Sequence, residues 1–303
     1  MKNQLKTIFL LGVLSAVLIA FGGALGPGYF YGFLLLAILL NFGAYFFSDR
    51  LVLKMSGAQE VTPEEAPGLH RMVEEMAQRA RIPKPRVCTI PDAQPNAFAT
   101  GRNPRHGVVA VTEGIVDLLT ERELRGVVAH EMAHIKNRDI LVSTIGAVIG
   151  AAIGYLANAL TFASFFGANQ DEGEEGNSST AGSLLFILVA PIVATLVQFA
   201  ISRAREYMAD ETGARLANDP EALARALEKL EHGAERIPAE TAQPATASLY
   251  IVNPLTGGGQ IANLFSTHPP VAERTRRLRA LDRPEIRLPP ERPTEQRRVG
   301  HAL

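Results

Sequence analysis

The sequence predicts a membrane protein that is mainly α-helical, with a small β-sheet in its soluble part. The chain has 303 residues, of which 47% are apolar and 20% are charged, and the charges are very unevenly distributed. Three long segments contain no Asp, Glu, Lys, Arg or His: residues 7–48, 140–170 and 176–202. Because about 20 apolar residues span the hydrocarbon core of a bilayer as a helix, these segments argue against a fully soluble protein.

The first charge-free segment predicts two transmembrane helices. A Gly-Pro-Gly turn at residues 26–28 divides it into apolar stretches near 7–25 and 29–47, each long enough to cross roughly 30 Å of hydrocarbon. A cleaved signal peptide is the alternative for the first stretch. Against it, the second apolar stretch begins at once, so no polar mature sequence follows a cleavage site.

The two later charge-free segments predict a transmembrane hairpin, with helices near 140–165 and 182–201. Their polar and helix-breaking residues would also suit a membrane-dipping or protein-buried hairpin: Ser143, Thr144, Asn158 and Pro191. We favour spanning, which gives four transmembrane helices. Basic residues flank one side of these segments, at Lys2, Lys6, Arg50, Lys54, Arg203 and Arg205, whereas the loop after the third segment is acidic. The positive-inside rule therefore places both termini and the soluble parts in the cytoplasm.

Composition limits the classes of function. The chain has 30 basic and 31 acidic residues, so binding to nucleic acid is not expected. Cys88 is its single cysteine, which excludes an intramolecular disulfide framework and any multi-cysteine metal site. A metal site would have to be built from histidines and carboxylates. Nothing in the sequence indicates an oligomeric state.

The first soluble part combines helices with a few strands. The capping pattern at Thr62-Pro63 predicts the start of a helix. Residues 86–90 and 108–112 have the composition of strands, whereas residues 95–101 between them follow no clear pattern. A capping box at Thr120 opens the helix that carries the main chemical signal.

In the second soluble part, helices are expected at 202–216, after Asp219-Pro220, and from Pro270 to Leu281. These elements divide the chain into five parts: two transmembrane helices (1–48), the first part of a catalytic domain (49–139), a helical hairpin (140–201), the second part of that domain (202–282) and a disordered tail (283–303).

His130-Glu131-Met132-Ala133-His134 is an H-E-x-x-H sequence in a helical context. A separation of four residues places both imidazoles on one helical face, where they can hold one metal ion. Catalytic zinc takes three protein ligands and keeps a position for water, whose pKa falls to about 7. Glu131 is then the candidate general base. Two histidines that make hydrogen bonds on a surface helix are the alternative.

A third ligand has to come from elsewhere, because no other histidine follows at the spacing of a three-histidine protease. Glu206, Asp210 and Glu211 lie on the helix after the fourth apolar segment, and an antiparallel hairpin would bring this helix to the H-E-x-x-H helix. Glu206 and Asp210 share a face, so one can bind metal while the other orients a ligand histidine. A salt bridge of Glu206 with Arg203 or Arg205 is the alternative, and spacing alone does not decide between them.

Four stretches of the sequence closely resemble HtpX, a family of bacterial membrane zinc metalloproteases related more distantly to the CAAX prenyl endopeptidases. They are residues 120–139, Asn-Ala-Phe-Ala-Thr-Gly at 96–101, Ser-Arg-Ala-Arg-Glu-Tyr-Met-Ala-Asp at 202–210 and Ser-Thr-His-Pro-Pro at 266–270. The resemblance covers nearly the whole chain, including the four apolar segments, but no motif matches after Leu281.

The resemblance implies one zinc ion per chain, held by His130, His134 and Glu206. It also implies that Glu131 is the general base and that Asp210 supports one of the zinc ligands without binding the metal itself. It further implies a multi-pass protein of the bacterial inner membrane that degrades damaged membrane proteins under stress. The expected partners are unfolded or misfolded proteins and the lipid bilayer.

Two further roles are candidates. A substrate could pair by β-augmentation with an edge strand, to which the resemblance points, made of Asn96, Ala97, Phe98 and Ala99; a surface loop is the alternative. His268 could stabilise the oxyanion, with Arg274 as a second candidate, although the two following prolines also suit a simple helix start.

The expected function is a membrane zinc endopeptidase with a zincin-type domain and a role in protein quality control. An intramembrane protease is one competitor, but the charges around H-E-x-x-H would be costly in a bilayer. A non-catalytic metal-binding scaffold or receptor is another, and the intact Glu131 argues against it. Unrestrained cleavage would damage the cell, so we expect the loop before Asn96 or residues 235–265 to cover the cleft.

Overall fold

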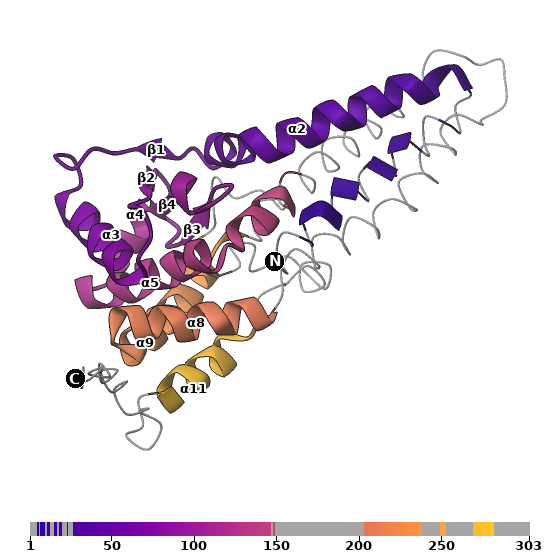
Figure 1. Ribbon diagram of the computed structural model, residues 1–303. Helices are drawn as coiled ribbons and strands as arrows, with labels where there is room; N and C mark the ends of the chain where they lie inside the picture. Colours follow the sequence, from indigo (N-terminus) through magenta and orange to yellow (C-terminus); the bar gives the residue numbers. More distant parts are fainter. Residues whose placement is uncertain are drawn as a thin grey trace, which may run out of the picture.

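The computed structural model describes residues 27–146, 203–237, 249–252 and 269–281, with Val148 and single residues within 5–23. The helix expected near 182–201, His268 and the tail 283–303 lie outside the described residues, as do most of the helices expected near 7–25 and 140–165. The described part is mainly helical with one small mixed sheet, as predicted (Figure 1).

Helix α2 (Phe30–Met55) projects from the folded domain as a long arm (Figure 1). In the described part of the chain it is the one helix long and apolar enough to cross a membrane. Most of its large apolar side chains are exposed, among them Leu35, Ile38, Leu39 and Phe42. The helix extends past the predicted end at residue 47 because its last turns, with Val52 and Leu53, pack on the sheet.

The sheet has four strands in the order β1-β2-β4-β3. Strands β2 (Arg86–Ile90) and β4 (Val108–Thr112) have the predicted bounds and pair in parallel. The short β1 (Gln59–Glu60) and β3 (Ala97–Thr100) pair antiparallel at the two edges. Local pattern did not predict β3, which is an edge strand as the resemblance suggested.

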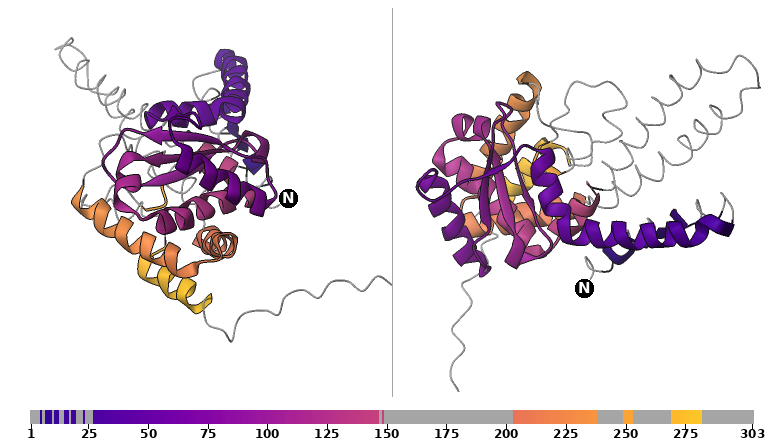
Figure 2. Two further views of the ribbon diagram at one scale, coloured as in Figure 1. Left: turned by 90° about the vertical axis from the view of Figure 1, so that its left-hand side faces the viewer. Right: turned by 90° about the horizontal axis from the view of Figure 1, so that it is seen from above.

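Two layers cover the sheet (Figure 2). Val87, Val109 and Val111 face the main core with helices α3 (Pro67–Ala80) and α5 (Glu121–Asn137). The side chains of the intervening residues, such as Cys88 and Phe98, lie on the opposite face of the sheet and pack against the end of α2. This alternation follows from the two-residue period of a strand.

The helix predicted to begin at Thr62 begins at Pro67 instead. Thr62 and Glu65 make the reciprocal capping bonds, at 2.7 and 3.3 Å, but they close only a single turn. Proline disfavours a helical conformation in the residue before it, and Ala66 is not helical. The helix therefore restarts with Pro67 at its first position.

Helices α8 (Arg203–Ala217) and α9 (Pro220–Arg236) pack against α5, and α11 (Val271–Leu281) packs on their outer side (Figure 1). The close approach of α8 to α5 requires a glycine, because a Cβ on Gly213 would meet the backbone of His130 at 2.8 Å. The short α4 (Glu113–Leu118) follows β4.

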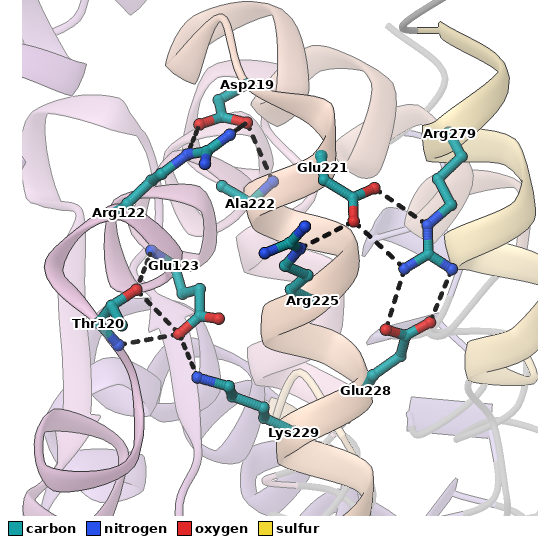
Figure 3. A network of polar contacts seen from close by, with 10 residues as sticks. All are labelled: Thr120, Arg122, Glu123, Asp219, Glu221, Ala222, Arg225, Glu228, Lys229 and Arg279. Atoms are coloured by element: carbon teal, nitrogen blue, oxygen red, sulfur yellow. Dashed lines mark hydrogen bonds and ion pairs between the residues drawn. The ribbon is translucent and has the colours of Figure 1, made fainter.

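A polar network ties the start of α5 to α9 and α11 (Figure 3). Thr120 and Glu123 form the predicted capping box, and Lys229 of α9 donates to Glu123 at 2.7 Å. Arg279 of α11 pairs with Glu221 and Glu228 of α9. These contacts fix the helices that carry the candidate site.

Candidate metal centre

Helix α5 presents His130, Glu131 and His134 from the interior of the domain. Its capping box satisfies the first free N–H groups, and Arg138 ends it in a left-handed conformation with φ of 57°. His130 and Glu131 are buried, with relative exposures of 0% and 2%. The four-residue spacing brings the two imidazole Nε2 atoms to 3.1 Å of each other.

Glu206 of α8 completes a group of three metal-ligating side chains. Its carboxylate oxygens lie 3.8 Å from His130 Nε2 and 3.7 Å from His134 Nε2. One ligand atom from each of the three residues lies within 4.8 Å of the others. Ligand atoms around a tetrahedral zinc ion lie about 3.3 Å apart when each bond is about 2.0 to 2.1 Å. The donor set and its spacing therefore fit such an ion.

Each ligand histidine is backed by a buried carboxylate. His130 Nδ1 lies 3.0 Å from Asp210 Oδ1, although this pair does not meet the angle of a good hydrogen bond. His134 Nδ1 lies 3.2 Å from both oxygens of Asp139. Carboxylates in this position orient a ligand ring and raise its basicity. Asp210 thus lies behind His130 as expected, whereas the sequence pattern assigned no role to Asp139.

Burial and neighbouring charges set the protonation of the metal-free cluster. Burial lowers the pKa of His130, which favours the neutral form that a metal requires. Burial also raises the pKa of Glu131 to about 7. For His134, burial lowers the pKa, but the charge and hydrogen bond of Asp139 together with the charges of Glu206 and Glu131 outweigh it and raise the pKa to about 10. Despite its burial, Asp210 has its pKa lowered to about 2, mainly by the charge of Arg274.

Two buried arginines stand beside the cluster. Arg274 of α11 binds Asp210 through two hydrogen bonds of 2.8 and 2.7 Å, and its Nη2 lies 3.5 Å from His130 Nε2. Arg205 of α8 lines a cavity at the cluster, and among the described residues neither of its terminal nitrogens has a hydrogen-bond partner. The sequence indicates Arg205 only as a possible salt-bridge partner of Glu206, whereas its burial beside the cluster is a property of the packing.

A cavity at the cluster reaches the edge strand β3. One cavity is lined by Ala99 of β3, by His130, Glu131 and His134 of α5, and by Leu249, Tyr250 and Ile251. The side chain of Asn96 makes a 2.8 Å hydrogen bond to the carbonyl of Val252. Of the residues expected to bind substrate, Ala99 lines the cavity at the cluster, and Asn96 contacts the segment that carries Ile251 and Val252. His268 lies outside the described residues.

We expect Asp139→Asn to weaken zinc binding by about 10- to 100-fold, since the amide no longer supports His134 as a charged acceptor. The dissociation constant can be measured by competition with a chromogenic chelator. Asp117→Asn, at an exposed position of α4, is the matched control and should leave the affinity unchanged. Equal affinity of the two variants would show that Asp139 does not support the ligand.

Two histidines and a glutamate around one point, with a further buried glutamate beside them, define a metallopeptidase site. Residues 63–282 match peptidase family M48. A protease HtpX homolog of Sulfurihydrogenibium sp. (strain YO3AOP1) is 50% identical over 290 residues, which cover 93% of this chain and 97% of that protein. Another, of Aquifex aeolicus (strain VF5), is 53% identical over 274 residues, which cover 89% and 90%. The crystal structure of S. mikatae Ste24p is 17% identical with a TM-score of 0.48, and the alignment covers 91% of this chain and 65% of that one.

The chain therefore belongs to peptidase family M48, among the HtpX proteases. It is a membrane metalloendopeptidase, and the family implies a metal, typically zinc. The expected alternative of a non-catalytic scaffold is thereby disfavoured.

Proposed function

We propose that this protein is a multi-pass zinc endopeptidase of the bacterial inner membrane that cleaves unfolded or damaged proteins, including membrane proteins, during stress. The observation that carries the proposal is the meeting of His130, His134 and Glu206 beside the buried Glu131. His130, His134 and Glu206 would hold one zinc ion. The names of the HtpX relatives support the peptidase activity.

Zinc, when bound, would lower the pKa of water and polarise the scissile carbonyl. Glu131 is buried beside the ligand histidines without belonging to the ligand group, so it is placed to take a proton from the attacking water. The same carboxyl group would then pass the proton to the leaving amine. Asp210 and Asp139 would hold the two ligand rings in orientation.

The substrate would bind in an extended conformation along β3. This strand is at the sheet edge, and β-augmentation uses such an edge because main-chain groups give affinity independently of sequence. Recognition of backbone rather than side chains suits a peptidase for unfolded proteins of many sequences. His268 remains our proposed oxyanion donor.

The four apolar segments would cross the membrane, and the catalytic domain with both termini would be cytoplasmic. The exposed apolar side chains of α2 support contact with lipid. The distribution of Lys and Arg supports the orientation. Residues 49–139 and 202–282 would then form one catalytic domain on the cytoplasmic face.

The proposal is tested by metal removal from the full-length protein in detergent. We expect cleavage of casein by the zinc-loaded enzyme, its loss after treatment with a chelator, and its recovery when zinc is added back in stoichiometric amount. Magnesium at the same concentration is the control and should restore nothing, because it disfavours histidine ligands. Full activity of the metal-free enzyme would overturn the proposal.

A further inference from the structure

Residues 249–252, here called the 249–252 segment, occupy the outer edge of β3. Thr112 donates its N–H to the carbonyl of Asn96 at 2.9 Å, so the alternation of an antiparallel pair turns the main-chain groups of Ala97 and Ala99 outward. These are the groups that a β-augmenting peptide would use. One of them is already engaged, since Ile251 donates its N–H to the carbonyl of Ala97 at 3.0 Å.

Side chains of the site hold the segment in the same manner. The Asn96 side chain contacts both main-chain groups of Val252, donating to its carbonyl at 2.8 Å and accepting from its N–H at 3.4 Å. On the other side, Arg274 Nη1 donates to the carbonyl of Ile251 at 2.9 Å. The backbone of the segment is bent and is not a strand, but the main-chain groups of Ile251 and Val252 are bound without reference to their side chains.

The segment is also packed as tightly as the core. Its four residues have relative exposures of 9, 2, 2 and 6%. The ring of Tyr250 packs edge-on against Phe98 of β3, with 5.3 Å between centroids. Burial of this aromatic side chain and its ring contact add to the stabilisation that the hydrogen bonds of the segment provide.

The segment leaves no room for a substrate. Leu249, Tyr250 and Ile251 form one wall of the cavity whose other wall contains His130 and Glu131, and the volume between them is about 20 Å³. A cavity of that size holds a single water molecule. A peptide bond can reach the catalytic residues only after this wall has moved.

From these contacts we propose that the 249–252 segment is an internal substrate mimic, which occupies the peptide-binding edge of the enzyme and must leave before an unfolded protein can bind. The proposal rests on the proposed function of the site. The resting enzyme is then a mixture of closed and open forms, and its apparent activity is proportional to the open fraction. Weakening the segment without touching the catalytic residues should raise activity.

The first test compares Tyr250→Ala with Tyr250→Phe in the full-length, zinc-loaded protein in detergent. The alanine variant loses the ring contact with Phe98, and we expect kcat/KM for casein to rise about fivefold or more. The phenylalanine variant keeps the ring contact with Phe98, so its kcat/KM should rise much less than that of the alanine variant. Zinc content and thermal unfolding of both variants establish that they are folded.

The outcomes separate the inference from the function on which it rests. Equal or lower activity of a folded, zinc-loaded Tyr250→Ala would overturn the inference, because the segment would then be a fixed wall of the groove. Absence of cleavage in wild type and in Tyr250→Ala alike would count against the proposed function.

A second measurement does not depend on activity. Hydrogen exchange of the Ile251 and Val252 amides is followed in zinc-loaded Glu131→Gln before and after saturation with casein. If casein displaces the 249–252 segment, these amides should exchange slowly in the free protein and at least tenfold faster in the complex. Unchanged protection in a complex whose formation is verified by co-sedimentation would contradict displacement, even if Tyr250→Ala fails to fold.

Discussion

Replacing Glu131 by glutamine is expected to abolish peptide cleavage while zinc stays bound. Glutamine has nearly the same volume, so the buried position next to His130 is filled in the same way. It cannot accept a proton, and the loss of a positioned general base lowers kcat by about 100- to 10,000-fold. The measurement is kcat on casein, together with zinc content per chain.

Glu121→Gln is the matched control, because Glu121 lies on the same helix and its side chain is 82% exposed. It should keep both zinc and activity. Loss of zinc from Glu131→Gln would indicate that Glu131 serves as a ligand. Retention of more than about a tenth of the wild-type activity would remove Glu131 from the catalytic role.

Replacing Arg274 by methionine is expected to destabilise the metal-free protein by about 3 to 5 kcal/mol, since it leaves the carboxylate of Asp210 buried without its main partner. The guanidinium is 1% exposed and makes two hydrogen bonds to Asp210 and one to Ile251. In a protein of this size the loss corresponds to a fall in Tm of roughly 10 °C. Thermal unfolding in detergent measures it.

Arg279→Met on the same helix is the control. Arg279 also pairs with two acidic side chains, Glu221 and Glu228 (Figure 3). Its side chain, however, is 45% exposed. Exposed pairs contribute about 0 to 1 kcal/mol, so its Tm should fall by less than about 3 °C. Similar small shifts for both variants would show that Asp210 finds another partner when Arg274 is absent.

Much of the fold was predictable because the signals were local. The capping box at Thr120, Asp219 before Pro220 and the apolar period of α9 each lie within a few residues, and the corresponding helices are confirmed. Strands β2 and β4 were predicted from β-branched runs bounded by prolines and glycine. The start of α3 was wrong because two start signals lie close together and Pro67, rather than Thr62, sets the helix.

The part of the site on α5 was also predictable from local sequence. The histidines of H-E-x-x-H share one face of α5 by helical geometry alone, so their meeting needs no information from the rest of the chain. Spacing alone does not decide whether Glu206 is a metal ligand or forms a salt bridge, and the family resemblance favours the metal ligand. Among the described residues, its ion pairs go to His130, His134 and Arg274.

By itself, the sequence determined the apolar segments, the main helices and the metal-binding pair of histidines. The tertiary structure decided that Asp139 supports His134, that Arg274 neutralises Asp210 and that Ile251 bonds to Ala97. The last two contacts join residues far apart in the chain, 64 residues in the case of Arg274 and Asp210. Helical and strand periods report only which side of an element is buried, whereas the partner on that side is chosen by the packing of the whole domain.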